Sequence, residues 1–235
     1  MNSNQLVFDL QGDISFDRNN FYVSSANKDT VKLVDSWSNW PTRCLAIIGP
    51  AGSGKSHLAS YWAEEVNAIV ISARDILLAE VPALSERGAI VVEDCDGIQL
   101  NSADQRAVNN IEQAMFHLLN ITSQKLSHIV LTGRTFPIDW PFALKDLVSR
   151  ITAFPIAELT TPDDELLMAV MLKQFEDKQI KVDPGLISFA CSRIDRTFEA
   201  VKNFVELIDR VALTEKREIT IPTANKVLKS LYARA

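Results

Sequence analysis

The chain has 235 residues, of which 47% are hydrophobic, and its 24 Lys and Arg residues against 30 Asp and Glu residues give a net charge of -6. This length and apolar content suffice for one large domain, or for a large and a small one. The acidic balance argues against non-specific binding to duplex DNA, which relies on Lys and Arg side chains at the phosphates. No apolar run approaches the roughly 18 residues that span a bilayer, and the polar start does not resemble a signal peptide, so a cytoplasmic location is expected.

Residues 1–12 contain apolar side chains at a spacing of two. In the segment QLVFDL, Gln5 is followed by Leu6, Phe8 and Leu10. This alternation is typical of an extended segment with one apolar face. It predicts either an edge strand of this chain or of a second copy, or a peptide that binds in a groove of another protein.

A phosphate-binding motif follows the first buried strand. The pattern predicts a strand at Cys44–Ile48 and a helix at Lys55–Val66, and GPAGSGKS between them satisfies G-x-x-x-x-G-K-[ST]. Glycines let backbone N–H groups point at phosphate oxygens, the lysine reaches the β and γ phosphates, and the hydroxyl holds Mg²⁺. An ordinary glycine turn before a helix is the weaker interpretation. The predicted nucleotide-binding residues are Gly49, Pro50, Ala51, Gly52, Ser53, Gly54, Lys55, Ser56 and His57, the last of them on the helix surface.

Acidic residues follow the third predicted strand. Strands are expected at 68–72 and at Ala89–Glu93, with a short helix at 73–78, and the sequence GAIVVEDCD contains Glu93, Asp94 and Asp96. A P-loop ATPase needs a carboxylate at the end of a neighbouring strand to hold the metal ion with the loop hydroxyl. Either Glu93 serves with Ser56, or Asp94 does so and Cys95 stands where a water-activating acid is expected. Both assignments predict slow hydrolysis by this chain alone.

The same alternation continues to residue 159. Further elements are expected as a helix at 103–120 with Ser102 and Gln105 as a capping box, a strand at 128–132, a helix at 142–151 and a strand at 153–156. Strands that alternate with helices are typical of a parallel sheet with crossover helices. Residues 13–159 are therefore predicted to form an α/β P-loop domain.

The remaining residues, 160–235, have a helical pattern. Thr161 to Asp164 are interpreted as an N-cap, a proline at the first helical position and two acids in the first turn. The helix that they open is expected to run to about residue 178, and further helices are expected at 184–193, 197–216 and 222–232. They predict a small all-helical second domain. Cys44, Cys95 and Cys191 are far apart among apolar neighbours, so buried free thiols are expected and not disulfides or zinc ligands.

Several motifs in this order resemble the AAA+ proteins of the DnaA/Hda family. They are the P-loop, VVEDCD, a strand ending in LTGR, the segment DLVSRI, and DRTFEAVKNF in the helical region. The resemblance covers nearly the whole chain and is greatest to the regulators of the Hda type. It implies a P-loop AAA+ ATPase fold, in which a parallel sheet flanked by helices is followed by a helical lid.

The resemblance implies roles for three more residues. Thr132 corresponds to the sensor 1 residue, Arg196 to the sensor 2 residue of the lid, and Arg150 to the arginine finger that these proteins present to a nucleotide in a neighbouring subunit. A rigid guanidinium neutralises charge that develops on the transferred phosphoryl group. Without the resemblance, Arg150 and Arg196 would be interpreted as ordinary surface charges.

The resemblance also favours the peptide interpretation of QLVFDL. The segment is similar to the motif with which bacterial proteins dock on the DNA polymerase sliding clamp, its beta subunit. Gln5 would make a polar contact, while Leu6, Phe8 and Leu10 would fill apolar pockets. An exposed apolar peptide also allows self-association into a homodimer or a higher oligomer.

The implied function is negative regulation of replication initiation. The protein would bind ADP or ATP with Mg²⁺, dock on the clamp, and promote hydrolysis of the ATP held by DnaA. The chain ends after the lid, so no sequence-specific DNA reading is expected. Two alternatives stay open: an autonomous AAA+ ATPase that acts as a remodeller or helicase loader, and an adaptor for which the nucleotide is irrelevant. The motifs do not distinguish ADP from ATP as the active ligand, nor do they fix the oligomeric state.

Overall fold

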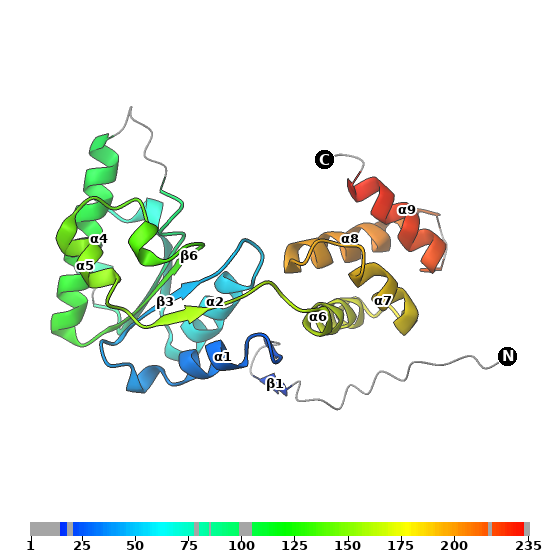
Figure 1. Ribbon diagram of the computed structural model, residues 1–235, viewed down its shortest axis with the longest axis horizontal. Coiled ribbons are helices and arrows are strands. Elements are labelled where there is room, and N and C mark those ends of the chain that lie inside the picture. Colours follow the sequence, from blue (N-terminus) through cyan, green and yellow to red (C-terminus); the bar gives the residue numbers. More distant parts are fainter. Residues whose placement is uncertain are drawn as a thin grey trace.

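The computed structural model describes residues 15–17, 21–77, 80–84, 86–98, 105–215 and 218–232. Within these residues an α/β part and a helical lid lie side by side (Figure 1). The clamp-binding prediction for residues 5–10 falls outside the described residues. None of the helices in the described part of the chain combines the length and the apolar composition that a membrane span requires.

The α/β part is built on a five-stranded parallel sheet with the order β4-β5-β6-β3-β7. Its strands are β3 (Cys44–Ile48), β4 (Ile69–Ser72), β5 (Ala89–Glu93), β6 (His128–Gly133) and β7 (Ile156–Glu158). In the register of the central strands, Ala46 of β3 lies opposite Leu131 of β6 and Ile156 of β7. Because the carboxyl ends of parallel strands share one edge, the P-loop, the acidic segment and Thr132 meet at that edge.

Helices cover both faces of this sheet, and the strand residues alternate between two apolar cores. One face packs against α3 (Val81–Leu84), α4 (Gln105–Lys125) and α5 (Lys145–Ile151). The other face packs against α1 (Lys28–Asp35) and α2 (Lys55–Val66), where Trp62 is fully buried. The near-continuous apolar runs of the strands follow from this two-sided burial.

The lid consists of α6 (Asp164–Asp177), α7 (Pro184–Cys191), α8 (Phe198–Glu215) and α9 (Ile221–Tyr232). Asp163 caps α6, because its carboxylate accepts a hydrogen bond from the Leu166 N–H at 2.7 Å. The four helices share a core of their own around Met171, Phe175 and Phe204, which are fully buried. The helical pattern that the sequence predicts after residue 160 therefore corresponds to a separate packing unit.

Several expected boundaries are corrected by the structure. The last strand of the sheet is Ile156–Glu158 and not 153–156, since residues 152–155 form the turn after α5. The helix expected at 142–151 begins only at Lys145, and the helix expected at 103–120 continues to Lys125. The short helix expected at 73–78 is a single 3-10 turn, η2 (Ala73–Asp75). Ser102 of the expected capping box lies outside the described residues.

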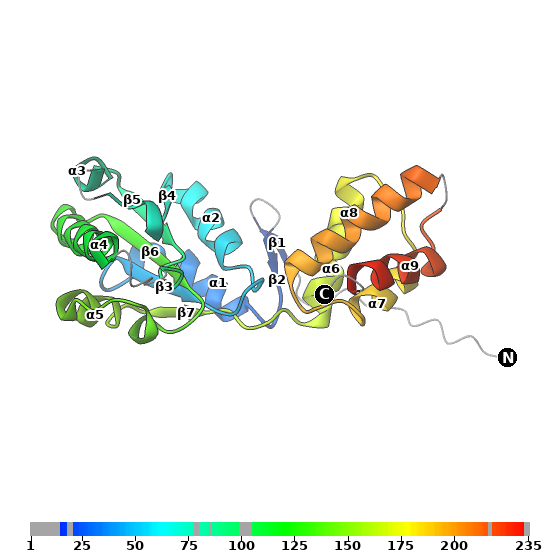
Figure 2. The same cartoon turned by 90° about the horizontal axis from the view of Figure 1, so that it is seen from above.

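The sequence pattern does not predict several of the elements. They are the antiparallel pair β1 (Ser15–Asp17) and β2 (Phe21–Val23), the helices α1 and α3, and the 3-10 turns η1 (Trp37–Asn39) and η4 (Pro137–Asp139). All of them except α1, which has eight residues, are segments of three or four residues, too short for a hydrophobic period to be recognised. Strand β2 matters for the site, because it contacts both α2 and α6 and so lies between the α/β part and the lid (Figure 2).

The three cysteines are free, as predicted. Cys95 and Cys191 are buried and Cys44 is half-buried. Burial raises the pKa of the Cys44 thiol to about 11 and that of Cys191 to about 12. These side chains therefore act as neutral packing groups at physiological pH.

Candidate functional site

The P-loop connects β3 to α2 and has the backbone that its glycines permit. Gly52 has a φ of 72° and Gly54, the N-cap of α2, a φ of 94°, both in the region that L side chains rarely adopt. Ser53 is buried, and its Oγ has no hydrogen-bond partner within the described chain. An unpaired buried hydroxyl inside a loop of this shape fits a ligand with phosphate oxygens.

The other predicted nucleotide-binding residues lie in this loop or in the first turn of α2. Pro50, Ala51, Ser56 and His57 are exposed, whereas Lys55 is buried at the first position of α2. The Lys55 Nζ donates hydrogen bonds to the carbonyl oxygens of Gly49 at 2.7 Å and Pro50 at 2.8 Å. The ammonium group is thus held over the loop by its own backbone, at the place where a phosphate would lie.

Charged groups from two neighbouring strands act on Lys55. Burial lowers the pKa of Lys55; Asp96 and Asp94 oppose this shift, and Arg134 adds to it. The backbone N–H of Arg134, which follows β6, donates to the Asp96 carboxylate at 2.8 Å. Asp96 and Arg134 therefore belong to the polar edge of the sheet, although the sequence prediction assigned neither a role.

Thr132 fixes the segment that follows β5. Its Oγ1 accepts a hydrogen bond from the Asp94 N–H at 3.1 Å, and its carbonyl oxygen accepts one from the Cys95 N–H at 2.9 Å. Asp94 has a positive φ of 56°, so these bonds hold it in a conformation that is unfavourable for a non-glycine residue. Thr132 thus contacts the acidic segment, and its role as a sensor 1 residue stays a prediction.

The two metal-side candidates have different surroundings. Glu93 is half-buried, and its Oε1 has no hydrogen-bond partner among the described residues, whereas Asp94 is exposed. Both supply the oxygen donors that Mg²⁺ prefers, together with the Ser56 hydroxyl. In the described part of the chain, no group of three or more His, Cys, Asp and Glu residues could hold a metal ion by itself. These residues fit an ion that also takes ligands from nucleotide phosphates.

The lid touches the P-loop directly. The Phe198 N–H donates to the Gly52 carbonyl oxygen at 3.3 Å. A Cβ atom added to Gly52 would lie 2.6 Å from the Thr197 Cβ, and one added to Gly54 would lie 2.9 Å from the Phe198 ring. Thr197 also caps α8 by accepting a hydrogen bond from the Ala200 N–H at 3.1 Å. The glycines therefore allow both the loop conformation and the close approach of the lid.

Arg196 lies at the boundary between lid and P-loop. It immediately precedes Thr197, and its guanidinium is 2.9 Å from a carboxylate oxygen of Asp164 at the start of α6. Both partners are about half exposed, with side-chain exposures of 56% and 53%, so the ion pair is weak and exchangeable. The structure thus brings the predicted sensor 2 arginine close to the loop, where it is paired within the lid.

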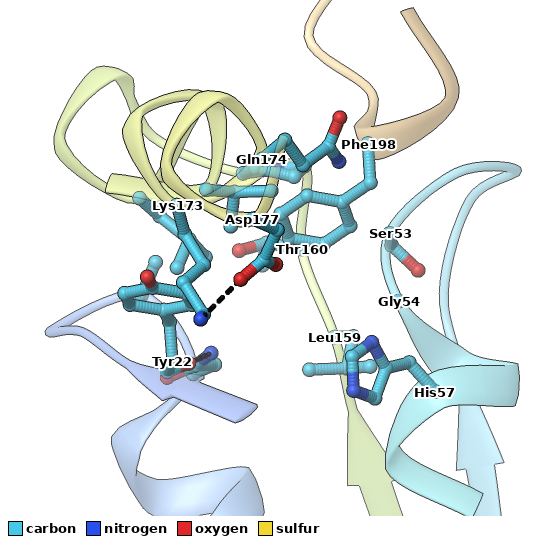
Figure 3. A pocket seen from close by; sticks show the side chains of 15 residues that line it. Tyr22, Ser53, Gly54, His57, Leu159, Thr160, Lys173, Gln174, Asp177 and Phe198 are labelled. Carbon is cyan, nitrogen blue, oxygen red and sulfur yellow. Dashed lines mark hydrogen bonds and ion pairs between the residues drawn. The ribbon is translucent and has the colours of Figure 1, made fainter. Parts of the chain in front are cut away.

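A cavity of about 200 Å³ lies beside the P-loop, between the α/β part and the lid. Tyr22 of β2, His57 of α2 and the Lys173–Asp177 ion pair of α6 converge on it (Figure 3). Most of its exposed lining is apolar and includes Leu159, Leu166, Val170 and Phe198. Its form suits a flat, mostly apolar group attached to a phosphate in the adjacent loop. His57 therefore lies on the helix surface, as predicted, and also on the cavity wall.

Arg150 is remote from this cavity. It is exposed near the end of α5, with its Cζ 5.3 Å from the centre of the Phe116 ring. The chain enters β7 a few residues later at Ile156, and β7 runs parallel to β3, whose carboxyl end leads into the P-loop. Arg150 therefore lies towards the amino ends of the strands, and α5 is on the side of the sheet away from the lid (Figure 1).

Comparisons with known proteins agree with this architecture. No family model matches the chain. In sequence, it is 25% identical over 121 residues to the replication initiator DnaA of Lactobacillus delbrueckii subsp. bulgaricus, which is 52% of this chain and 27% of that protein. Domain III of Thermotoga maritima DnaA superimposes with a TM-score of 0.73 at 18% identity, covering 89% of this chain and 94% of that one. The protein has the AAA+ fold of DnaA.

Two further structures broaden the comparison. AMPPCP-bound DnaA from Aquifex aeolicus matches with a TM-score of 0.65 at 18% identity, over 84% of this chain and 68% of that one. A point mutant of Thermotoga maritima RuvB matches with a TM-score of 0.66 at 14% identity, over 93% and 73% of the two chains. The predicted fold class, a parallel AAA+ sheet flanked by helices and followed by a helical region, is confirmed.

Proposed function

We propose that this protein is a regulator of replication initiation that binds an adenine nucleotide, docks on the sliding clamp, and promotes hydrolysis of ATP held by DnaA. Its sequence similarity to DnaA and its DnaA-like fold support an association with replication initiation. The observation that carries the proposal is the position of Arg150.

An arginine finger that acts in trans must reach a phosphoryl group held by the P-loop of another subunit. Arg150 is exposed and lies at the end of the sheet opposite its own P-loop, so its guanidinium is available to a second AAA+ subunit. Its planar, permanently charged group suits the equatorial oxygens of a phosphoryl group in transfer. The similarity to DnaA supports DnaA as that second subunit, with hydrolysis of its ATP as the accelerated reaction.

The protein's own nucleotide is proposed to have a structural role. We place its phosphates at Gly52, Ser53, Lys55 and Ser56, and its base in the cavity beside Tyr22 and Phe198. The Aquifex aeolicus DnaA structure, which holds AMPPCP, supports an adenine nucleotide. Bound Mg²⁺, held by Ser56 with Glu93 or Asp94, would neutralise phosphate charge.

In the assignment that gives the metal ion to Asp94, slow turnover of this nucleotide is expected from Cys95, the residue that follows it. Cys95 is fully buried, and burial raises the pKa of its thiol far above neutrality. A buried neutral thiol cannot take a proton from an attacking water molecule at physiological pH. This supports ADP as the form that the protein carries.

The clamp contact is tested with DnaA preloaded with labelled ATP in the presence of DNA-loaded clamp. The intact protein is expected to accelerate phosphate release, and a variant with both Gln5→Ala and Leu6→Ala is expected to lose this effect, because it lacks the polar contact and one apolar anchor of the peptide. Equal acceleration by both forms would refute clamp docking through QLVFDL. No acceleration by the intact protein would refute the proposed function as a whole.

The nucleotide site is tested by Gly52→Ala. The φ of 72° at this position is unfavourable for alanine, and the new Cβ would collide with Thr197. The affinity for a fluorescent ADP analogue is therefore expected to fall about tenfold. Gly88→Ala is the matched control, because a Cβ there meets no atom within 4 Å in the described structure. Unchanged affinity in Gly52→Ala would contradict the placement of the nucleotide between loop and lid.

A further inference from the structure

We propose that helix α4 positions Arg150 through two residues one turn apart, Glu112 and Phe116. The inference rests on the proposed function, since it assigns a support to the arginine that carries it. Neither residue would touch the nucleotide. They act through Arg150 and are positioning residues, so the proposal concerns how the finger is presented to a neighbouring subunit.

Glu112 fixes the start of the helix that carries Arg150. Its side chain is buried, with 7% exposure, and its Oε1 accepts hydrogen bonds from the N–H groups of Ala143 and, at 3.2 Å, Leu144. Leu144 is the N-cap of α5 and offers no side-chain cap. In a capping box, a glutamate of the same helix bonds the N-cap N–H; here a glutamate of the neighbouring helix does so.

Phe116 supports the other end of the same helix. It follows Glu112 by four residues, so both side chains lie on one face of α4. Its ring lies under the Arg150 guanidinium, with 5.3 Å from Cζ to the ring centre, a distance at which a cation is attracted to an aromatic face. The two contacts therefore hold α5 at its first residue and at its functional arginine.

The apolar face of α5 packs into the sheet core, so the freedom that remains is that of the Arg150 side chain. Leu147 and Ile151 are fully buried in the sheet core, so the helix itself has little freedom. The long side chain of Arg150, which is exposed, keeps several rotatable bonds. The Phe116 ring beneath the guanidinium reduces the number of conformations that the Arg150 side chain can adopt. It thereby lowers the entropy cost when Arg150 binds a phosphoryl group.

The experiment compares three phenylalanine variants in the stimulated hydrolysis of DnaA-bound ATP. Phe116→Leu removes the aromatic face and is expected to slow hydrolysis about twofold to fivefold, while Phe116→Tyr keeps the face and retains the rate. Phe189→Leu is the matched control, because it removes a second arginine–phenyl contact of the described residues, Arg193 over Phe189 at 3.9 Å, which lies in the lid. This control is expected to leave the rate unchanged.

A spectroscopic readout separates positioning from a change in DnaA binding. The Arg150 Nε–H resonance, assigned by its loss in Arg150→Lys, is expected to be shifted by the Phe116 ring current and to move in Phe116→Leu alone. A stimulated rate or an Arg150 resonance that is unchanged in Phe116→Leu would overturn the inference and leave the proposed function intact. Failure of the wild-type protein to stimulate DnaA would instead refute the proposed function, and with it this inference.

Glu112 is tested at the level of backbone protection. Glu112→Leu removes both acceptor bonds, whereas Glu112→Gln keeps an acceptor oxygen in place. Hydrogen exchange at Ala143 and Leu144 is expected to rise at least about tenfold in the leucine variant and much less in the glutamine variant, because exchange follows local opening. Equal protection in both variants and the wild type would refute the capping role.

Discussion

Arg150→Ala is expected to lower the stimulated rate of hydrolysis of DnaA-bound ATP by roughly a thousandfold, the lower end of what an arginine finger contributes to phosphoryl transfer. The loss follows because no other group of α5 supplies a planar cation that can pair with two phosphoryl oxygens. The rate is measured in single turnovers, with labelled ATP held by DnaA. The affinity of the variant for its own nucleotide should not change, since Arg150 lies at the opposite end of the sheet from the P-loop.

Two further substitutions make this result specific. Arg150→Lys keeps the charge but loses the fork of donors, so it should restore little of the activity. Arg210→Ala removes an exposed arginine of the lid helix α8 and should retain the full stimulated rate. A stimulated rate in Arg150→Ala equal to that of the wild type would show that another group acts on DnaA.

Lys55→Ala is the second substitution with a large expected effect. It removes the ammonium group that lies over the loop, and the affinity for ADP is expected to fall about a hundredfold, the value of a charged hydrogen bond to a phosphate. Isothermal titration calorimetry measures this loss directly. Lys202→Ala is a suitable control, since Lys202 is an exposed lysine on the lid whose side-chain exposure is 66%. Undiminished affinity would contradict the role of the P-loop.

The same variant separates the three functional interpretations. If the nucleotide acts as a structural switch, the Lys55→Ala variant is expected to lose its stimulation of ATP hydrolysis by DnaA. Full stimulation by a folded Lys55→Ala protein would indicate an adaptor for which the nucleotide is irrelevant. Turnover of ATP by the wild-type chain that is independent of DnaA and lost in Lys55→Ala would indicate an autonomous ATPase.

The sheet and the lid were predictable because their patterns are long or locally coded. The apolar runs of β3, with five residues, and of β5, with four, are buried on both faces, and their order with the intervening helices predicts parallel pairing. A helix start in this region was recognisable from the sequence, but the predicted N-cap at Thr161 is wrong, because α6 begins at Asp164 and Asp163 is its N-cap. In contrast, β1 and β2 have three residues each, and no periodicity can be read from such a length.

Only part of the candidate site was accessible from sequence. The P-loop residues follow one another in the chain, so a motif identifies them. Tyr22, Thr197 and Phe198 come from distant segments and reach the cavity or the loop only through the packing of the lid. Asp96 had a weak signal as the third acid of EDCD, but its contact with Arg134 depends on the pairing of neighbouring strands.

The proposed function is tested most directly by determining which subunit's nucleotide is hydrolysed. DnaA and this protein are mixed with DNA-loaded clamp in two reciprocal experiments, with labelled ATP on DnaA in one and on this protein in the other. We expect rapid phosphate release from DnaA that requires Arg150 of this chain, and slow release from this protein in either mixture. Rapid release from this protein's own P-loop, with no acceleration on DnaA, would contradict the proposed function.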